Sequence, residues 1–204
     1  MSVFRRAAER RGSPASLLVV GIGNPGPQYN GTRHNIGFEV VELLVARHNG
    51  AFKLEKRERS SVATIRLDGE LAALARPTTF MNLSGESVAP LVKRFGIEDP
   101  MNVVVVHDEL DLDPGRLKVK IGGSSAGHNG LKSISQHLGT DDYVRVRVGV
   151  GKPPHPRAGK DWVLKKPGKA DREALDDVVH RAADAIEAIA ARGPAAAMND
   201  FNRA

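Results

Sequence analysis

The sequence predicts a single α/β domain built on a mixed, twisted β-sheet with helices on both of its faces. Apolar residues change along the chain between strand-like runs and helical spacing, which is the pattern of a sheet covered by helices. Residues 103–106 are a continuous run of valines, typical of a central strand that is covered on both faces. No repeat or low-complexity linker divides the 204 residues, and 41% of them are hydrophobic, enough for one sizeable core.

The first half of the chain predicts three strands and a helix. Residues 17–22 form an apolar run that ends in a loop rich in glycine and proline, and they indicate a buried strand. From residue 36, apolar residues recur at helical spacing until an Asn-Gly pair ends the helix. Residues 61–67 and 70–75 predict two strands joined by an Asp-Gly turn.

The second half of the chain adds helices and two basic strands around the valine run. A helix is expected from about residue 83 to residue 95, ended by a glycine. Residues 116–121 and 143–150 alternate between basic and apolar types, so each predicts a strand with one solvated face. A short helix over 131–138 separates them, and a long amphipathic helix is expected over 170–192, ended by a Gly-Pro pair.

The charge balance favours an anionic partner, with RNA the first candidate. Lysine and arginine total 30 against 24 acidic residues, which gives a net charge of +6 and a pI near 9.8. Aromatic residues make up only 4%, so contacts with a nucleic acid should rely on charge and amides rather than on stacking. The absence of cysteine excludes disulfides, thiolate nucleophiles and cysteine-based metal centres.

Residues 1–16 are predicted to be a flexible basic tail, and residues 17–204 a single domain. The first dozen residues carry four arginines and no apolar segment, unlike a secretory signal. The longest apolar runs are far shorter than the roughly 20 residues of a membrane-spanning helix. We therefore expect a cytoplasmic protein that has no membrane association.

One motif suggests a dinucleotide cofactor, but its surroundings argue against it. Residues 21–26 read GIGNPG and match the G-x-G-x-x-G spacing directly after a strand. That fingerprint needs a helix to begin inside the motif, whereas the next periodic helix begins about ten residues later. Pro25 and Pro27 also remove backbone N–H groups that a pyrophosphate would use. A nucleotide-dependent oxidoreductase is therefore a minor alternative, and we expect no cofactor.

Loops at the ends of predicted strands carry four groups of polar residues that suit ester hydrolysis. A histidine beside a carboxylate is the simplest general base at neutral pH, and asparagine amides can hold a carbonyl or a water without ionising. No serine lies in a nucleophile elbow, so no covalent acyl-enzyme is indicated. The groups are Asn24 with Tyr29 and residues 32–35, then residues 79–82, 107–109 and 127–130.

Each group also has a plainer interpretation. Asparagines in Gly/Pro loops commonly cap turns, and His34 fits a half-buried histidine at the start of a helix. The acidic run at 108–113 is typical of a solvated turn at a strand end. His107 and His128 suggest a metal site with Asp108 and Glu109, but their spacing fits no usual ligand pattern, and we expect no metal.

The order of these motifs resembles that of the bacterial-type peptidyl-tRNA hydrolases. The resemblance runs from about residue 17 to residue 192 and rests on GIGNPGPQYNGTRHNIGF, RPTTFMNLSG, HDELDLDPGRLKVK and GHNGLKSI, followed by RVRVGVGKP, with AMNDFN near the C-terminus. It implies hydrolysis of the ester bond between an N-blocked peptide and tRNA. It also implies a monomer without cofactor or obligate protein partner.

The resemblance implies a role for individual residues. It makes His34 the general base on the attacking water and Asp108 the carboxylate that orients its imidazole. Three asparagines match amides that hold the peptide and the ester, and one of them would polarise the carbonyl. Two further residues match positions that line the crevice. The asparagines are Asn24, Asn82 and Asn129, and the lining residues are Tyr29 and Met81.

The basic residues are concentrated in one part of the chain. Between residues 114 and 169 there are twelve lysines and arginines against three acidic residues. Alternation places Lys118 with its basic neighbours on one face of a strand, and Arg145 with Arg147 on one face of another. A solvated strand face explains this equally well. The resemblance makes Lys118 and Arg147 a clamp for a terminal phosphate of tRNA, a contact that does not depend on base sequence.

The chain departs from the family pattern at one loop, and the resemblance also allows one main alternative function. Residues 124–126 read SSA where many members of the family are richer in glycine, which leaves the mobility of that loop in doubt. Chloroplast proteins with this fold act in RNA splicing, so a non-catalytic RNA-binding protein is the main alternative. The presence of Asn24, His34, Asn82, Asp108 and Asn129 together favours the enzyme.

Overall fold

The computed structural model describes residues 3–4, 14–155 and 158–203. Most of the predicted basic tail, residues 1–2 and 5–13, lies outside the described residues, so its flexibility stays a prediction. The described parts of that segment contact the domain. Phe4 and Ala15 are buried against the apolar core, and the Ala15 N–H donates to the carbonyl of Phe95. Among the described residues, no helix combines the length and the apolar character needed to cross a membrane.

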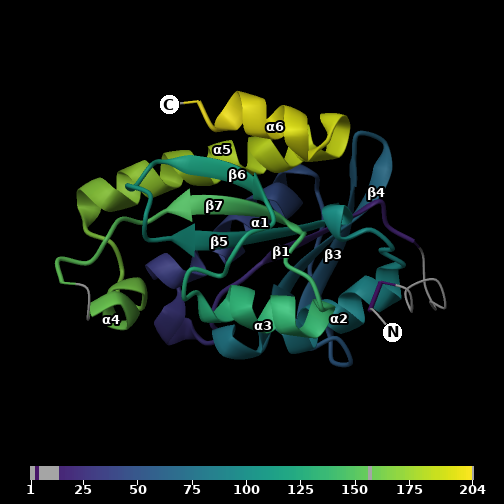
Figure 1. Ribbon diagram of the computed structural model, residues 1–204, viewed down its shortest axis with the longest axis horizontal. Coiled ribbons are helices and arrows are strands. Elements are labelled where there is room, and N and C mark those ends of the chain that lie inside the picture. The colour runs from purple at the N-terminus through teal and green to yellow at the C-terminus, as the bar shows by residue number, and fades with distance from the viewer. Residues whose placement is uncertain (1–2, 5–13, 156–157, 204) are drawn as a thin grey trace.

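Within the described residues, a seven-stranded sheet forms the centre of the molecule (Figure 1). It is mixed, as predicted, and contains strand β2, which was not predicted. Strands β4, β1, β5 and β7 lie side by side in parallel. Antiparallel strands flank them, β3 and then β2 beyond β4, and β6 beyond β7. The strands are β1 Leu17–Gly21, β2 Lys53–Glu55, β3 Ser60–Leu67, β4 Glu70–Pro77, β5 Val103–Glu109, β6 Leu117–Ile121 and β7 Val144–Gly149.

Helices cover both faces of the sheet, which confirms the predicted architecture. Helices α1, α5 and α6 share one apolar cluster with the sheet, and α2 and α3 share another on the opposite face (Figure 1). The helices are α1 Ile36–Arg47, α2 Ser84–Phe95, α3 Asn129–Leu138, α4 Gly159–Val163, α5 Lys169–Arg192 and α6 Pro194–Phe201. Short 3-10 helices at Pro27–Tyr29, Arg33–Asn35, Met81–Leu83 and Pro100–Asn102 connect these elements.

The valine run in β5 shows why the sheet needs both layers. Side chains alternate across a strand, so Val103 and Val105 enter the cluster on the α2–α3 face, while Val104 and Val106 enter the cluster on the α1–α5 face. All four are fully buried. Burial of apolar side chains on both faces stabilises β5 at the centre of the molecule and positions the residues that follow it.

Two glycines bring the start of α1 close to the sheet. A Cβ added at Gly21 would lie 2.0 Å from the carbonyl oxygen of Gly37 in α1. A Cβ added at Gly37 would lie 2.4 Å from the carbonyl oxygen of Val106 in β5. Only glycine allows backbones to approach this closely. The contact therefore holds the turn Arg33–Asn35, immediately before α1, beside the carboxyl ends of β1 and β5.

Several local expectations need correction. Strand β5 continues through Glu109, so residues 107–109 lie inside the strand and are buried, rather than in a solvated turn. The Gly-Pro pair after α5 ends that helix and also starts α6, because Pro194 occupies the first helical position. The backbone N–H at that position has no partner within the helix, so proline is tolerated there. The short elements β2, α4 and α6 carry too few periodic residues to be predicted.

Candidate active site

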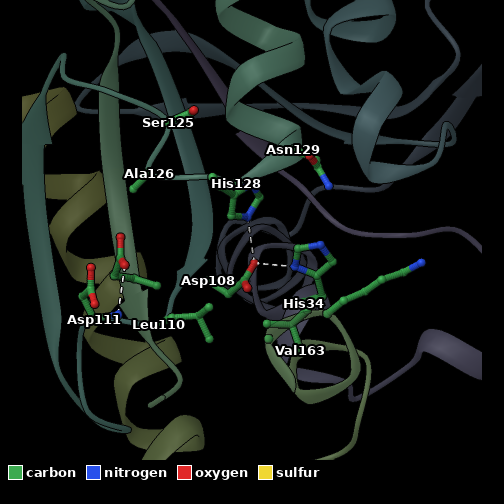
Figure 2. A pocket seen from close by; sticks show the side chains of 13 residues that line it. His34, Asp108, Leu110, Asp111, Ser125, Ala126, His128, Asn129 and Val163 are labelled. Carbon is green, nitrogen blue, oxygen red and sulfur yellow. Dashed lines mark hydrogen bonds and ion pairs between the residues drawn. The ribbon is translucent and has the colours of Figure 1, made fainter. Parts of the chain in front are cut away.

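The polar groups singled out in the sequence meet at one edge of the sheet. Parallel strands end at a common edge, so the loops after β1 and β4 and the end of β5 lie together. Here a cavity of about 350 Å³ is lined by His34, Asp108, His128 and Asn129, with further walls from residues 109–111, residues 125–127 and α4 (Figure 2). The cavity brings together residues from four separate parts of the chain.

A partly buried His34 and a buried Asp108 form a hydrogen-bonded pair beside this cavity. The His34 Nδ1 lies 2.8 Å from Asp108 Oδ1, and Asp108 is only 3% exposed. A carboxylate can only accept, so Nδ1 carries the hydrogen and Nε2 keeps its lone pair. Burial lowers the pKa of His34, but the charge of Asp108 and its hydrogen bond raise it by more, so the net shift is upward. The imidazole therefore has an Nε2 lone pair that can accept a proton.

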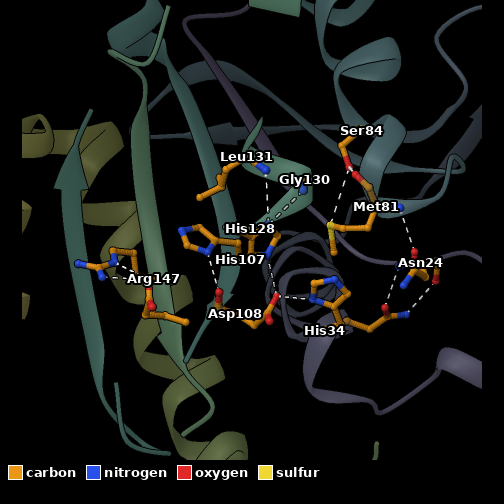
Figure 3. Close-up of polar contacts among 12 residues, drawn as sticks. Asn24, His34, Met81, Ser84, His107, Asp108, His128, Gly130, Leu131 and Arg147 are labelled. Atoms are coloured by element: carbon orange, nitrogen blue, oxygen red, sulfur yellow. Dashed lines mark hydrogen bonds and ion pairs between the residues drawn. The ribbon is translucent and has the colours of Figure 1, made fainter. Parts of the chain in front are cut away.

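A second histidine supports the same carboxylate. His128 Nε2 lies 3.0 Å from Asp108 Oδ1, the oxygen that also accepts from His34 (Figure 3). The backbone N–H groups of Gly130 and Leu131, in the first turn of α3, donate to His128 Nδ1 at 3.2 and 3.4 Å. That nitrogen is therefore unprotonated, and Nε2–H donates to Asp108. His128 thus links the start of α3 to the His34–Asp108 pair, a contact that its sequence context did not reveal.

The electrostatics of the cluster follow from burial and these two imidazoles. Burial alone would raise the pKa of Asp108, but His34 and His128 hold it well below its usual range. Asp108 is therefore ionised whenever the protein is folded at neutral pH. This keeps a negative charge beside His34, where it stabilises the imidazolium formed when a proton is taken up.

His107 is excluded from acid–base work by its surroundings. Its side chain is 1% exposed, its Nδ1 donates to the Asp108 carbonyl oxygen at 2.7 Å, and its ring packs edge-on against His128. Burial, followed by the electrostatic interaction with His128, lowers the pKa of His107 to about 3. The residue is neutral at physiological pH and faces the protein interior.

The arrangement also bears on the metal site considered from the sequence. His107 and Glu109 do not join a ligand set. Among the described residues, the group with suitable spacing is His34, Asp108 and His128, whose ligand atoms lie within 4.8 Å of one another. All three are already engaged in the hydrogen bonds above. The absence of a metal from the reaction stays a prediction.

Asn24 is held rigidly on the other side of His34 (Figure 3). Its backbone N–H donates to Asn35 Oδ1 at 2.8 Å, and Asn35 Nδ2 donates to its carbonyl oxygen at 3.0 Å. Its own Oδ1 accepts from the backbone N–H of Met81 at 2.9 Å. The carboxamide is therefore oriented with Nδ2 available as a donor. Asn35 belongs to one of the polar groups singled out in the sequence, but its contact with the Asn24 backbone was not predicted.

Of the remaining predicted residues, Met81 contacts Asn24 and Asn129 lines the cavity. Met81 is buried, and a Cβ added at Gly130 would lie only 2.5 Å from the Met81 sulfur. Met81 therefore packs the loop after β4 against the start of α3. Tyr29 packs edge-on against Phe80, which is 51% exposed. The side chains of Asn82 and Asn129 are exposed, and Asn129 also lines the cavity.

The basic strands place the two predicted clamp residues next to each other. Lys118 in β6 lies directly opposite Arg147 in β7, and Lys118 is exposed. Arg147 donates through Nε and Nη2 to a single oxygen of Glu109, at 3.0 and 2.9 Å. That carboxylate fixes one edge of the guanidinium and leaves the other edge available.

Arg145 differs from the prediction of a solvated face. It is 3% exposed, and its guanidinium donates to the carbonyl oxygens of Gly123 and Ser124. The loop between β6 and α3 therefore folds over Arg145, which anchors it. Alternation in the sequence gives the face of a strand but does not show what covers that face.

Comparisons with known proteins agree with this geometry. A family model described as peptidyl-tRNA hydrolase matches residues 18–204. The peptidyl-tRNA hydrolase of Rhodococcus opacus is 50% identical over 187 residues, covering 92% of this chain and 98% of that protein. That of Mycobacteroides abscessus is 49% identical over 190 residues, covering 93% and 96%. The chain belongs to the peptidyl-tRNA hydrolase family.

The fold agrees with a solved member of the peptidyl-tRNA hydrolase family. The crystal structure of peptidyl-tRNA hydrolase from Acinetobacter baumannii superposes with a TM-score of 0.86 at 34% identity, covering 94% of this chain and 97% of that one. Because the superposition covers most of both chains, the two proteins share this fold.

The turn that carries His34 also contacts α4 in this member of the peptidyl-tRNA hydrolase family. Arg33, immediately before His34, is buried, with its guanidinium carbon 3.8 Å from the centre of the Trp162 ring. It also pairs with Asp171 in α5 at 2.8 Å. Because α4 contributes Gly159 and Lys160 to the cavity wall, Arg33 couples the position of His34 to that wall.

Proposed function

We propose that this protein hydrolyses the ester bond between an N-blocked peptide and tRNA, using a water activated by His34. The observation that carries the proposal is the His34–Asp108 pair with an unprotonated Nε2, next to an asparagine amide whose donor is oriented for use. Membership of the peptidyl-tRNA hydrolase family supports the same reaction.

The reaction follows from these groups in two steps. His34 Nε2 takes a proton from water as the oxygen attacks the ester carbonyl, and Asp108 stabilises the imidazolium. Asn24 Nδ2 donates to the oxygen that becomes negative in the tetrahedral intermediate. The intermediate then breaks its bond to the 3′ oxygen of tRNA, which takes the proton from His34. Free peptide and free tRNA are the products.

The peptide is held by amides and the tRNA by charge. Asn82 and Asn129 hydrogen-bond the peptide backbone, and Tyr29 and Met81 line the crevice beside it. An unblocked amino acid would place a charged amine against these neutral amides, which disfavours its binding. Discrimination between blocked and unblocked substrates therefore arises at this end of the site.

The clamp binds a terminal phosphate of tRNA without reading its sequence. Lys118 and Arg147 project from paired strands, and phosphate contacts of this kind position RNA for chemistry elsewhere. We further propose that the protein works in the cytoplasm as a monomer, without cofactor, metal or obligate protein partner, and returns tRNA to translation.

One experiment tests the reaction, the specificity and the base. The purified protein is incubated with an N-blocked aminoacyl-tRNA and with the unblocked form, in the presence of EDTA, and the His34→Ala variant is run in parallel. We expect rapid release of only the blocked amino acid, lost in the variant. Binding of tRNA without release would instead indicate a non-catalytic RNA-binding protein.

A further inference from the structure

The C-terminal segment makes a specific contact with the outer edge of the sheet. The carboxamide of Asn202, at the end of α6, bonds both backbone groups of Val119 in β6. Its Oδ1 accepts from the Val119 N–H at 2.7 Å, and its Nδ2 donates to the Val119 carbonyl oxygen at 2.9 Å. One side chain thus makes the pair of bonds that a neighbouring strand would make.

These backbone groups point away from the rest of the sheet. The ladder between β6 and β7 is bounded by the bond from Gly149 N to Arg116 O and the bond from Gly122 N to Tyr143 O. In an antiparallel ladder, hydrogen-bonded and non-bonded pairs alternate, so Val119 belongs to a non-bonded pair. Its N–H and carbonyl would lack a protein partner without Asn202.

The contact lies between the basic residues of β6. Val119 faces the α5–α6 side of the sheet and is buried there, while Lys118 and Lys120 on either side of it are exposed. Lys118 is paired in register with Arg147, and Arg147 with His107 in β5. Lys118, Arg147 and His107 are therefore consecutive members of one row across the sheet, and the position of β6 sets the spacing between Lys118 and Arg147.

The opposite edge of the sheet has a different arrangement. Strand β2 has three residues, and Leu54 at its centre is 60% exposed. On the β6 edge, by contrast, α6 buries Ala197 against the core, and Met198 and Phe201 pack beside it. This packing brings Asn202 to Val119, so the edge that carries the clamp is also the edge that is held from outside.

We propose that Asn202 is a positioning residue for tRNA binding, which holds β6 so that Lys118 and Arg147 keep the spacing that one phosphate requires. The inference rests on the proposed clamp. Without Asn202, the backbone N–H and carbonyl of Val119 hydrogen-bond water instead. Strand β6 then moves more freely against β7, and Lys118 and Arg147 bind phosphate less tightly. The chemical step is unaffected, because no atom of Asn202 contacts the His34–Asp108 pair.

The test compares Asn202→Ala and Asn202→Leu with wild type on two substrates, an N-blocked aminoacyl-tRNA and a short N-blocked aminoacyl ester that lacks the terminal phosphate. We expect KM for the tRNA substrate to rise on the order of three- to tenfold, the usual effect of losing one or two net hydrogen bonds. We expect kcat on both substrates to stay at the wild-type value and the salt dependence of KM to weaken.

Two controls separate positioning from a general loss of structure. Asn199→Ala removes an exposed asparagine from the same helix and should change neither KM. In a double-mutant cycle, Asn202→Ala should raise KM for the tRNA substrate by a smaller factor in a Lys118→Ala background than in wild type, since both changes act on one contact. A thermal melt and turnover of the short ester report on folding.

Each outcome is decisive. The positioning role would be overturned by an equal loss of activity on both substrates or by an unchanged KM for the tRNA substrate. Full additivity of the effects of Asn202→Ala and Lys118→Ala would also overturn it. If wild type hydrolyses neither substrate, the proposed function fails, and this result is distinct from failure of the Asn202 proposal.

Discussion

The histidine cluster and the basic strands belong to one sheet but hold their functional side chains in different ways. His34, Asp108 and His128 are connected by short hydrogen bonds that determine which nitrogen carries each proton. Lys118 is exposed, and Arg147 is oriented by a single carboxylate. A buried network has few alternative arrangements, whereas exposed cations adjust to their ligand. Changes in the first region should therefore act on kcat, and changes in the second on KM and its salt dependence.

The largest effect is expected at His34. Replacing it by alanine removes the proposed general base and should lower kcat by about 10²- to 10⁴-fold while leaving the fold intact. Single-turnover release from N-blocked aminoacyl-tRNA measures this, and circular dichroism checks the fold. His180→Ala, which removes an exposed histidine in α5, is the matched control. Near-wild-type turnover in His34→Ala would show that the histidine cluster does not control kcat, which is what distinguishes it here from the basic strands.

A smaller loss is expected at Asp108. Asp108→Asn keeps the size of the side chain but loses the charge, and a hydrogen bond to a charged group corresponds to about a 10- to 100-fold change in rate. The pH profile adds a sharper readout. His34 acts when neutral, and its pKa is raised, so wild-type kcat/KM should fall as pH drops through a value above 6.5. In Asp108→Asn this midpoint should move to lower pH, and an unmoved midpoint would contradict the pairing.

The basic strands should respond differently. Lys118→Glu reverses a charge in the clamp, so KM for a tRNA substrate should rise, and the slope of log KM against log salt should fall by about 1. Turnover of a short peptidyl ester should stay near wild type. Steady-state kinetics at several salt concentrations measure both. A proportional loss on the short ester would show that the two regions are not separable.

The smallest effect is expected at the boundary between the regions. Ala126 lines the cavity, in the loop that Arg145 anchors, and has a φ of 47°, a conformation that costs an L-residue about 1 kcal/mol. Ala126→Gly relieves this strain and should raise the free energy of unfolding by up to about 1 kcal/mol, measured by urea denaturation. Ala174→Gly, in α5, should lower it instead, since glycine destabilises a helix interior. A loss of stability in Ala126→Gly would show that this φ is not strained.

The sequence predicted the framework because strong periodicity extends over long segments. The valines of β5 and the apolar faces of α1, α2 and α5 identify their elements without further information. Short elements such as β2 and α4 carry only a few residues, and their positions depend on contacts that no local pattern records.

The site was predictable in its residue types and less so in its partners. Histidine, aspartate and asparagine in strand-end loops indicated base catalysis, and the structure brings His34, Asp108 and Asn129 to one cavity. The roles of His128 and Asn35 depend on which backbone groups they meet, and Arg145 is buried by a loop more than twenty positions away. Such contacts form only when the chain is folded, so spacing alone does not reveal them.

The close contact between Gly21 and Gly37 explains the G-x-G-x-x-G spacing at residues 21–26, which resembles a dinucleotide-binding motif. The protein has this spacing although its site is suited to hydrolysis. In a dinucleotide fold, the glycines after the first strand make room for a pyrophosphate. Here the same kind of space is filled by the protein itself, because the α1 backbone occupies it. The same glycine spacing can thus provide space for a ligand or allow a helix to pack closely against a strand. The surrounding prolines and the starting point of the helix distinguish the two cases.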